Sequence, residues 1–307
     1  MKSISKKRKL WNAVKQNWQL YLLLIPCIVF FVIFNYLPIY GVQIAFRDYK
    51  VAFGISGSQW VGLEHFKTFF EAHYFSRLIS NTLLLNLYSL LLGFPIPILL
   101  ALMLNRIRFS RFKKFTQTMI YVPHFISTVV MAGMLYIFLS PTNGIFNTVI
   151  QAFGGDPINF MVEPGMFRPI YVLSGVWQDA GWGTILYLAA LTGIDQALYE
   201  AAEIDGASIW QKIRHIDIPS IVPICAMVFI LECGKLMNSN TEKTLLLQTP
   251  GNVATSDVLG VYVYNVGLGS AKFSYTAAIG LFINIINFIL IISVNQLSKK
   301  VSDTGLF

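Results

Sequence analysis

Charged side chains are scarce in this sequence. Asp, Glu, Lys and Arg make up 12% of its 307 residues, whereas hydrophobic residues make up 55%. A soluble globular domain carries roughly 25% charged residues. Half of that share leaves too little polar surface to face water. Because apolar runs recur along the whole chain, the composition excludes a soluble domain with a single anchor and indicates a polytopic membrane protein.

Residues that carry catalysis or bind metals are also few. The three cysteines, Cys27, Cys225 and Cys233, lie in apolar segments without metal-type spacing, so we expect buried, inert thiols. Only four histidines occur, and no two are expected to share a helix face with a carboxylate inside a span. No G-x-x-x-x-G-K-[ST] pattern exists, which excludes ATP hydrolysis by the P-loop route. We therefore expect no catalytic residue, no metal site and no cofactor bound by this chain.

The net charge of +8 is placed beside the apolar runs. Basic residues cluster at Lys2–Lys15, Arg106–Lys114 and Lys299–Lys300, as the positive-inside rule predicts for cytoplasmic segments. The segment Ser140–Phe167 has no Lys or Arg and is expected outside. The basic arm is expected to contact anionic lipid headgroups. No basic groove or motif indicates nucleic acid.

The apolar runs predict an all-α fold with six membrane-spanning helices. A helix needs about 20 mainly apolar residues to cross the hydrocarbon core, and these runs are too long for membrane strands. If the N-terminus is cytoplasmic, as the basic clusters indicate, six spans return the C-terminus to the same side. The predicted spans are Leu20–Ala45, Arg77–Leu104, Met119–Leu139, Arg168–Leu191, Ile218–Leu236 and Phe273–Leu297.

The predicted cytoplasmic loop before the fifth span is acidic, against the charge rule. It reads EAAEIDGASIWQKIRHIDIP from Glu200 to Pro219. Tyr199–Ile204 favours a helix, and Gly206 can adopt the positive φ that ends one. A second helix is then expected to run into the fifth span, with Pro219 near its start. The alternative is an amphipathic helix that only anchors the chain, which explains neither the carboxylates nor the glycine.

This loop resembles the cytoplasmic EAA loop of binding-protein-dependent ABC importer permeases, which have a type-1 transmembrane domain. The stretches LPIYGVQIAFRDY, WVGLEHF, YVPHFIS, SGVWQDAGWGTILYLAALTGID and FSYTAAIGLF resemble the carbohydrate branch, labelled multiple-sugar or polysaccharide permeases. In that family the loop docks on a separate ATPase subunit. The resemblance implies ATPase docking by Glu200, Ala201, Ala202, Asp205, Gly206 and Ala207.

The resemblance also implies a domain organisation. Residues 1–76 would hold the basic arm, the first span and an extracytoplasmic loop. Residues 77–296 would form the type-1 transmembrane domain, with its EAA loop at 199–219. Residues 297–307 would form a cytoplasmic tail.

The solute path is expected along the fourth span. An ionisable residue within a span usually faces the bundle interior or water. Asp179 lies there between Trp177 and Trp182, and sugars are commonly held by aromatic faces and carboxylates. The alternative is that Asp179 hydrogen-bonds a neighbouring helix and the tryptophans belong to the interfacial belt. The candidate path residues are Trp177, Asp179, Trp182, Tyr187, Asn86 and Asn284.

Other polar groups in the spans have a more structural interpretation. Glu232 and Lys235 lie three residues apart and are expected to pair, with pathway lining as the alternative. Asn81 and Asn86, like Asn284 and Asn287, are expected mainly to join helices.

The sequence thus predicts a non-catalytic permease subunit, half of a pore that imports a sugar such as an oligosaccharide across a prokaryotic cell membrane. The resemblance implies a second permease, two ATPase subunits that use ATP and Mg²⁺, and an extracytoplasmic solute-binding protein. A permease for a non-sugar solute and an ion-coupled secondary transporter remain alternatives. The latter would show two broken-helix repeats and coupling-ion carboxylates. The sequence does not identify the solute.

Overall fold

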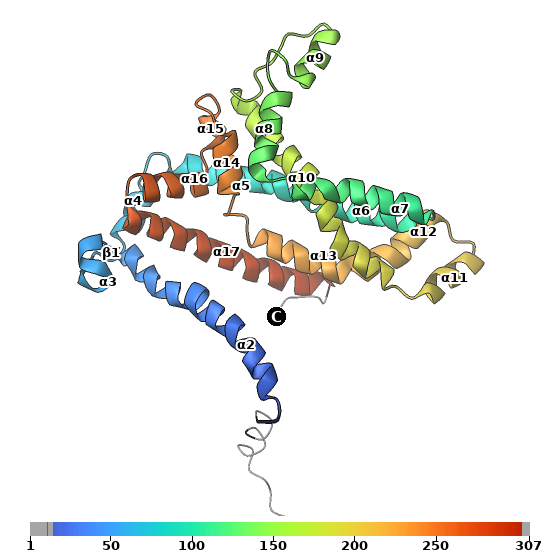
Figure 1. The fold of residues 1–307 in the computed structure, drawn as a ribbon, viewed down its shortest axis with the longest axis horizontal. Coiled ribbons are helices and arrows are strands. Elements are labelled where there is room, and N and C mark those ends of the chain that lie inside the picture. Colours follow the sequence, from blue (N-terminus) through green and yellow to red (C-terminus); the bar gives the residue numbers. More distant parts are fainter. Residues whose placement is uncertain (1–10, 12–14, 303–307) are drawn as a thin grey trace, which may run out of the picture. The chain divides into compact units, whose positions relative to one another are not determined.

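The computed structural model describes residue 11 and residues 15–302, which fold almost entirely into helices (Figure 1). Most of the predicted basic arm and the last residues of the predicted tail lie outside this part. The chain forms two compact units. One comprises the residues up to Phe69 with Lys272–Leu281, and the other comprises Phe70–Ala271 with the residues from Phe282 onward.

The first unit contains the first predicted span. Helix α2 (Trp18–Phe31) continues through the π-helix η1 (Val32–Tyr36) and the 3-10 helix η2 (Leu37–Phe46). Proline lacks a backbone N–H, and local π or 3-10 geometry is one way a membrane helix satisfies the carbonyls that it leaves free. No residue of α2 is buried within the chain, as expected for a helix that faces lipid or another protein. Cys27 is therefore exposed, and its predicted burial within the chain is wrong.

The rest of the first unit consists of short elements and the start of a long helix. Strands β1 (Arg47–Asp48) and β2 (Gln59–Trp60) pair antiparallel. The remaining elements are η3 (Val51–Phe53), α3 (Gly54–Gly57), α4 (Glu64–Phe70) and the start of α17 (Phe273–Ser302).

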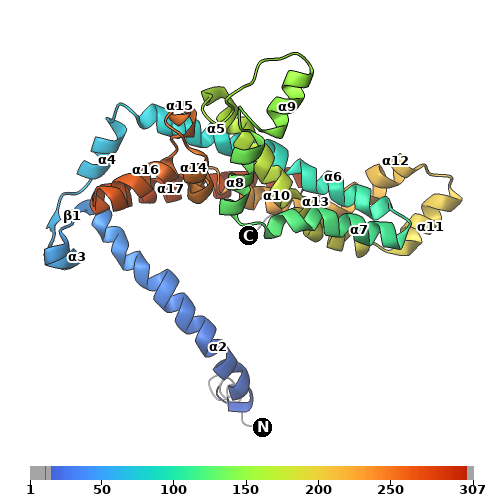
Figure 2. The same cartoon turned by 45° about the horizontal axis from the view of Figure 1, so that its top comes forward.

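The second unit is a helical bundle. Its elements are α5 (Phe75–Gly93), α6 (Pro95–Arg106), α7 (Ser110–Tyr121), η4 (Val122–Phe125), α8 (Thr128–Phe138), α9 (Ile145–Ala152), α10 (Pro164–Thr192), α11 (Gln196–Ile204), α12 (Ile209–Lys212), η5 (Ile213–Asp217), α13 (Ile218–Cys233), α14 (Thr241–Leu247), α15 (Val253–Ser256), α16 (Leu259–Tyr264), η6 (Asn265–Gly269) and the rest of α17. In both ribbon views α11 and α12 form one end of this unit (Figures 1 and 2).

The all-α prediction is confirmed, and several helices can cross a membrane. Within the described residues, four are long and apolar enough: Trp18–Phe46, Phe75–Arg106, Ile209–Cys233 and Phe273–Lys300. Helix α10 is 29 residues long but is not among them. The count of six spans stays a prediction.

The third predicted span, Met119–Leu139, is not one straight helix. Ser110–Phe125 and Thr128–Phe138 meet at an angle of 98°. Pro123, in the last turn before the break, has no N–H to donate, and Ser127 starts the new helix by accepting a hydrogen bond from the Val130 N–H at 3.3 Å. The amide of Gln178 donates to the carbonyl of Ile126 at 2.7 Å, so the bend leaves this backbone group satisfied.

Helix α10 is the packing centre of the second unit, in contact with α5, α6, α7, α13, α14 and α15. Two apolar clusters surround it. One joins Tyr171 and Val172 of α10 to α14 and α16, and the other joins Tyr187 and Leu191 to α6 and α13.

Buried amides join these helices, as predicted. The Asn81 amide donates to the carbonyls of Ala254 and Asp257, while its oxygen accepts from Arg168 at 2.8 Å. The Asn287 oxygen accepts from the Met237 N–H at 3.1 Å.

Candidate functional site

A cavity of about 910 Å³ opens beside α10 within the second unit. Its walls come from the facing sides of α5, α6 and α10, from the end of α13, and from α14 with the residues before it. The cavity is therefore enclosed by helices that belong to the predicted spans, together with one short helix that follows them.

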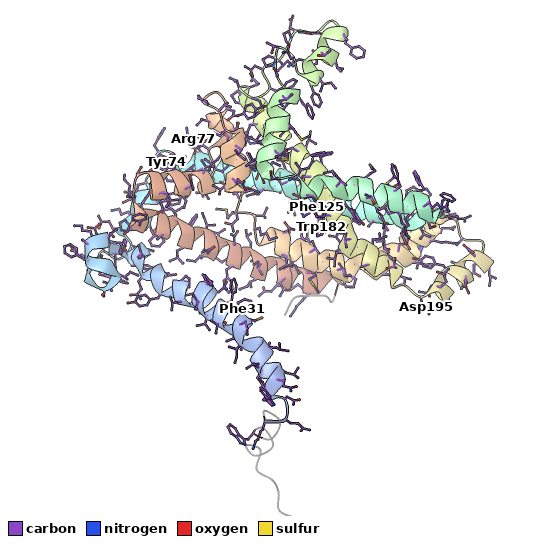
Figure 3. All side chains as sticks on the ribbon, viewed as in Figure 1. Phe31, Tyr74, Arg77, Phe125, Trp182 and Asp195 are labelled. Carbon is purple, nitrogen blue, oxygen red and sulfur yellow. The ribbon has the colours of Figure 1, made fainter. Side chains whose placement is uncertain are left out.

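A cluster of polar and aromatic side chains lies at this cavity. Asp179, with a side chain 66% exposed, faces His124 of the bent segment, whose Nδ1 lies 3.0 Å from Asp179 Oδ1. The His124 ring stacks on Trp182 at 4.6 Å between centroids, and Phe125 meets Trp182 edge-on at 5.8 Å. Figure 3 shows Phe125 beside Trp182. The carboxylate thus lies within hydrogen-bond distance of His124, and such a contact lowers the penalty of placing it in a span.

Two glycines let the surrounding helices approach α10. A Cβ on Gly181 would lie 1.8 Å from the Ile120 carbonyl oxygen at the end of α7. A Cβ on Gly183 would lie 3.1 Å from Pro97 of α6. Small residues allow such close backbone packing between membrane helices. Because Ile120 is four residues before His124, the contact at Gly181 brings the bent segment to Asp179.

The candidate path residues separate into two groups. Asn86, Asp179, Trp182 and Tyr187 line the cavity, and Asn86 also donates to the Leu236 carbonyl at 2.9 Å. Trp177 and Asn284 are exposed residues that do not line it.

The expected pair of Glu232 and Lys235 is confirmed, with nitrogen and oxygen 2.9 Å apart. Both residues also line the cavity. Glu232 and Lys235 therefore pair with each other and also form part of the cavity wall.

Two further residues at the cavity were not predicted from the sequence. His124 was placed only at the start of a span, because its pairing depends on the bend. Lys243, in α14, is 5% exposed and lines the wall. The sequence offered one sign of an unusual role for Lys243: it stands next to Glu242 in a stretch that otherwise has few charged residues.

The acidic loop forms the predicted helical hairpin. The side chain of Asp195, labelled in Figure 3, caps α11 by accepting from the Ala197 N–H at 2.9 Å. Gly206 has φ +71° and follows the end of α11. The Ala207 N–H returns to the Ala202 carbonyl at 2.8 Å, which closes the turn that a left-handed glycine makes at a helix end. The prediction of a helix stopped by Gly206 is confirmed.

The second arm of the hairpin begins at Ser208. The Ser208 side chain accepts from the Gln211 N–H, and the Gln211 side chain accepts from the Ser208 N–H at 2.7 Å. The helix runs on through η5 into α13 as the continuous stretch Ile209–Cys233. One continuous helical stretch therefore joins the hairpin to residues that line the cavity.

The outer face of the hairpin combines charge with apolar surface. Ile204 is 88% exposed and Trp210 is 79% exposed, beside exposed Glu200 and Asp205. Of the predicted docking residues, Glu200, Ala201, Asp205 and Gly206 are exposed, and Ala202 and Ala207 are half-buried. Large exposed apolar side chains with polar neighbours mark surfaces that bind other proteins.

Two polar ties fix the inner face of the hairpin. Asp217, with no exposed surface, accepts hydrogen bonds from Arg106 at the end of α6 and from the Tyr199 hydroxyl of α11 at 2.5 Å. Burial, followed by the bond to Asp217, raises the pKa of Tyr199 to about 12. Lys212 donates to Glu203 at 2.7 Å, which lowers the pKa of that carboxyl.

The family described as "Binding-protein-dependent transport system inner membrane component" matches residues 93–303. The chain belongs to this family. It is thus a multi-pass membrane permease of the ABC transport class, and the resemblance of its loop and spans to such permeases is confirmed.

Relatives of the permease match it nearly end to end. The polygalacturonan/rhamnogalacturonan transport system permease protein YteP of Bacillus subtilis is 41% identical over 306 residues, 100% of this chain and 95% of the relative. The arabinooligosaccharides transport system permease protein AraP of the same organism is 30% identical, over 92% of this chain and 88% of the relative. In the crystal structure of a bacterial alginate ABC transporter with an alginate pentasaccharide-bound periplasmic protein, one chain has a TM-score of 0.88 and 40% identity, covering 97% of this chain and 100% of that one.

Proposed function

We propose that this permease forms half of the pore of an importer and takes up an oligosaccharide handed over by a solute-binding protein. The observation that carries the proposal is the continuity of α12 with α13. The exposed hairpin stands at one end of this helical stretch, and the residues after its other end line the cavity. A force applied to the hairpin can thereby change the cavity.

The hairpin is proposed to dock on an ATPase subunit through the face that carries Glu200, Asp205 and Gly206. Ala201, Ala202 and Ala207 are small side chains that let a partner approach the helix closely. The exposed Ile204 and Trp210 supply the apolar area that a protein contact needs. The permease itself has no P-loop, so ATP and Mg²⁺ would be used by the partner, and the permease would be non-catalytic.

The complete transporter is proposed to contain this permease, a second and different permease, two ATPase subunits and an extracytoplasmic binding protein. It would lie in a prokaryotic cell membrane with both termini of this chain in the cytoplasm. This orientation puts the docking hairpin on the side where ATP is available.

The cargo proposal rests on the cavity and on the relatives. Trp182 offers an aromatic face, and Asn86, Asp179 and Tyr187 offer hydrogen-bonding groups that suit sugar hydroxyls. The similar proteins are named for polygalacturonan/rhamnogalacturonan, arabinooligosaccharides and alginate. These names share a cargo of linked sugar units, which supports an oligosaccharide as the solute proposed for this permease.

Gly206 provides the test of docking. Valine there has room, because nothing lies within 4 Å of a built Cβ, but φ +71° strains a β-branched residue. In proteoliposomes with the partner subunits, Gly206→Val should uncouple ATP hydrolysis from uptake while the complex still assembles. Gly206→Asn should retain most of the coupling, since Asn tolerates this conformation.

Gly154 is the matched control for backbone strain without a docking role. Its φ is +81°, and nothing lies within 4 Å of a Cβ built there. It lies outside the hairpin, and Gly154→Val should leave ATP hydrolysis per transported solute unchanged. Normal coupled uptake by Gly206→Val would refute the docking role.

A further inference from the structure

Lys243 has a position in the cavity wall that packing alone does not explain. Its ammonium donates to the Tyr171 carbonyl at 2.8 Å and lies 4.6 Å from the centre of the Tyr171 ring. Lysine is almost never buried without a partner of opposite charge. A buried cation at the wall of a cavity is therefore a feature that requires a reason.

The other charged groups of this wall have partners. Glu232 forms an ion pair with Lys235, and Asp179 lies within hydrogen-bond distance of His124. Among the described residues, no carboxylate forms an ion pair with Lys243. Burial lowers its pKa to about 8, and Asp179 at longer range acts in the opposite direction. The ammonium is thus a desolvated cation whose charge is not balanced by contact with the protein.

Lys243 lies in the cavity wall, and its ammonium packs closely against α10. A Cβ built on Gly175 would lie 3.0 Å from the ammonium nitrogen, so a side chain at this position would crowd the cation. Both Gly175 and Tyr171 line the same cavity. An ammonium has three N–H donors, and Tyr171 uses one of them.

We infer that Lys243 is the point at which this cavity recognises a carboxylate of its cargo, so that the cargo is an acidic oligosaccharide built from uronate residues. The inference rests on the proposed function and adds the chemical class of the sugar. A uronate carboxylate would supply the missing counter-charge and accept the remaining ammonium donors. Trp182 and Asp179 would meet the apolar face and the hydroxyls of the same molecule.

Direct binding to the assembled transporter tests this inference without the binding protein, whose own specificity then plays no part. The probes are radiolabelled trigalacturonate and its methyl ester, which removes the charge and adds one methyl group at each carboxyl. Because hydrogen bonds to charged groups contribute strongly, the acid should bind about tenfold to a hundredfold more tightly than the ester.

Lys243→Gln should remove that preference. Its affinity for the acid should fall to that of the ester, while its affinity for the ester stays as in the parent, which also shows that the cavity remains folded. Lys272→Gln removes the same charge at an exposed position outside the cavity and should keep the preference.

The pKa of Lys243 gives a second readout that needs no variant. The cation binds the carboxylate and the neutral amine does not, so affinity for the acid should decline as the pH rises through about 8. Affinity for the ester should change less. The titratable groups that face the same cavity are Tyr171, Asp179 and Tyr187 from α10, and Glu232 and Lys235 from the end of α13 and just beyond.

The outcomes are distinct. Equal binding of acid and ester by the parent, an unchanged preference in Lys243→Gln, or displacement of the acid by inorganic phosphate at equal concentration would overturn the inference. It would leave the oligosaccharide function standing as long as a saccharide binds. If neither saccharide binds while the transporter imports another solute, the proposed function fails as well.

Discussion

Asp217 is the buried charge that joins the helical hairpin of α11 and α12 to α6, so Asp217→Asn should weaken both stability and coupling. Asparagine keeps the shape and can still accept from the Tyr199 hydroxyl. It leaves Arg106 without its counter-charge, and Arg106 Nε is already without a hydrogen-bond partner among the described residues. Asp217→Asn therefore tests the charge of the Arg106–Asp217 pair while the shape of the side chain and the Tyr199 hydrogen bond are kept.

The expected loss can be estimated from the burial of the two partners. Removing one partner of a buried ion pair costs about 3–5 kcal/mol. Because the Arg106 side chain is 23% exposed and can be partly hydrated, the lower end of that range applies. A loss of about 3 kcal/mol should lower the thermal midpoint of the purified complex by on the order of 5 °C or more. Arg106→Met with Asp217→Leu should recover much of it, since no charge is left unpaired.

Coupling is measured as solute imported per ATP hydrolysed, in proteoliposomes with loaded binding protein. Tyr199→Phe leaves the ion pair intact and removes the hydroxyl that ties α11 to Asp217. It should lower stability by about 1 kcal/mol and reduce the ratio of transport to hydrolysis. If both Tyr199→Phe and Asp217→Asn keep the parental ratio, the tie only stabilises the fold and the reasoning is wrong.

Three further predictions concern the cavity, the packing of α10 and the topology. Asp179→Asn and Trp182→Ala should each reduce uptake about tenfold while ATPase association is retained; parental uptake by both would show that this face of α10 only packs. Gly181→Ala should lower the yield of folded protein, because its Cβ would lie 1.8 Å from a backbone oxygen of α7; normal stability would mean that α7 can move away. In a cysteine-free background, an impermeant thiol reagent should label Cys introduced at Asn143 from outside and at Ser110 only after permeabilisation, and the reverse pattern would invert the topology.

The fold of the hairpin formed by α11 and α12 could be predicted from the sequence because its determinants are local. Gly206 ends α11 through its own backbone freedom, and Ser208 caps α12 through a residue three positions away. Glu232 and Lys235 were paired for the same reason, since residues three apart share a helix face. Such features need no knowledge of how the chain is packed.

The bent third span could not be predicted by hydropathy. Met119–Leu139 is mainly apolar and contains no Asp, Glu, Lys or Arg, and its hydropathy does not distinguish one straight helix from two that meet at 98°. The bend requires Gln178, more than fifty residues away, to satisfy the carbonyl of Ile126. The break is therefore a property of the packed bundle.

The same contrast between local and packing-dependent features explains why only some of the charged residues at the cavity could be predicted from the sequence. Asp179 could be identified because a carboxylate in a span is costly wherever its neighbours lie. Lys243 could not, because it lies outside the predicted spans and becomes buried only when α14 packs against α10. The sequence thus identified Asp179 as a candidate to bind sugar hydroxyls. It did not identify Lys243, which we infer binds a carboxylate of the sugar. The chemical class of the cargo therefore depends on a contact made by folding, and the comparison of trigalacturonate with its ester is the measurement that decides it.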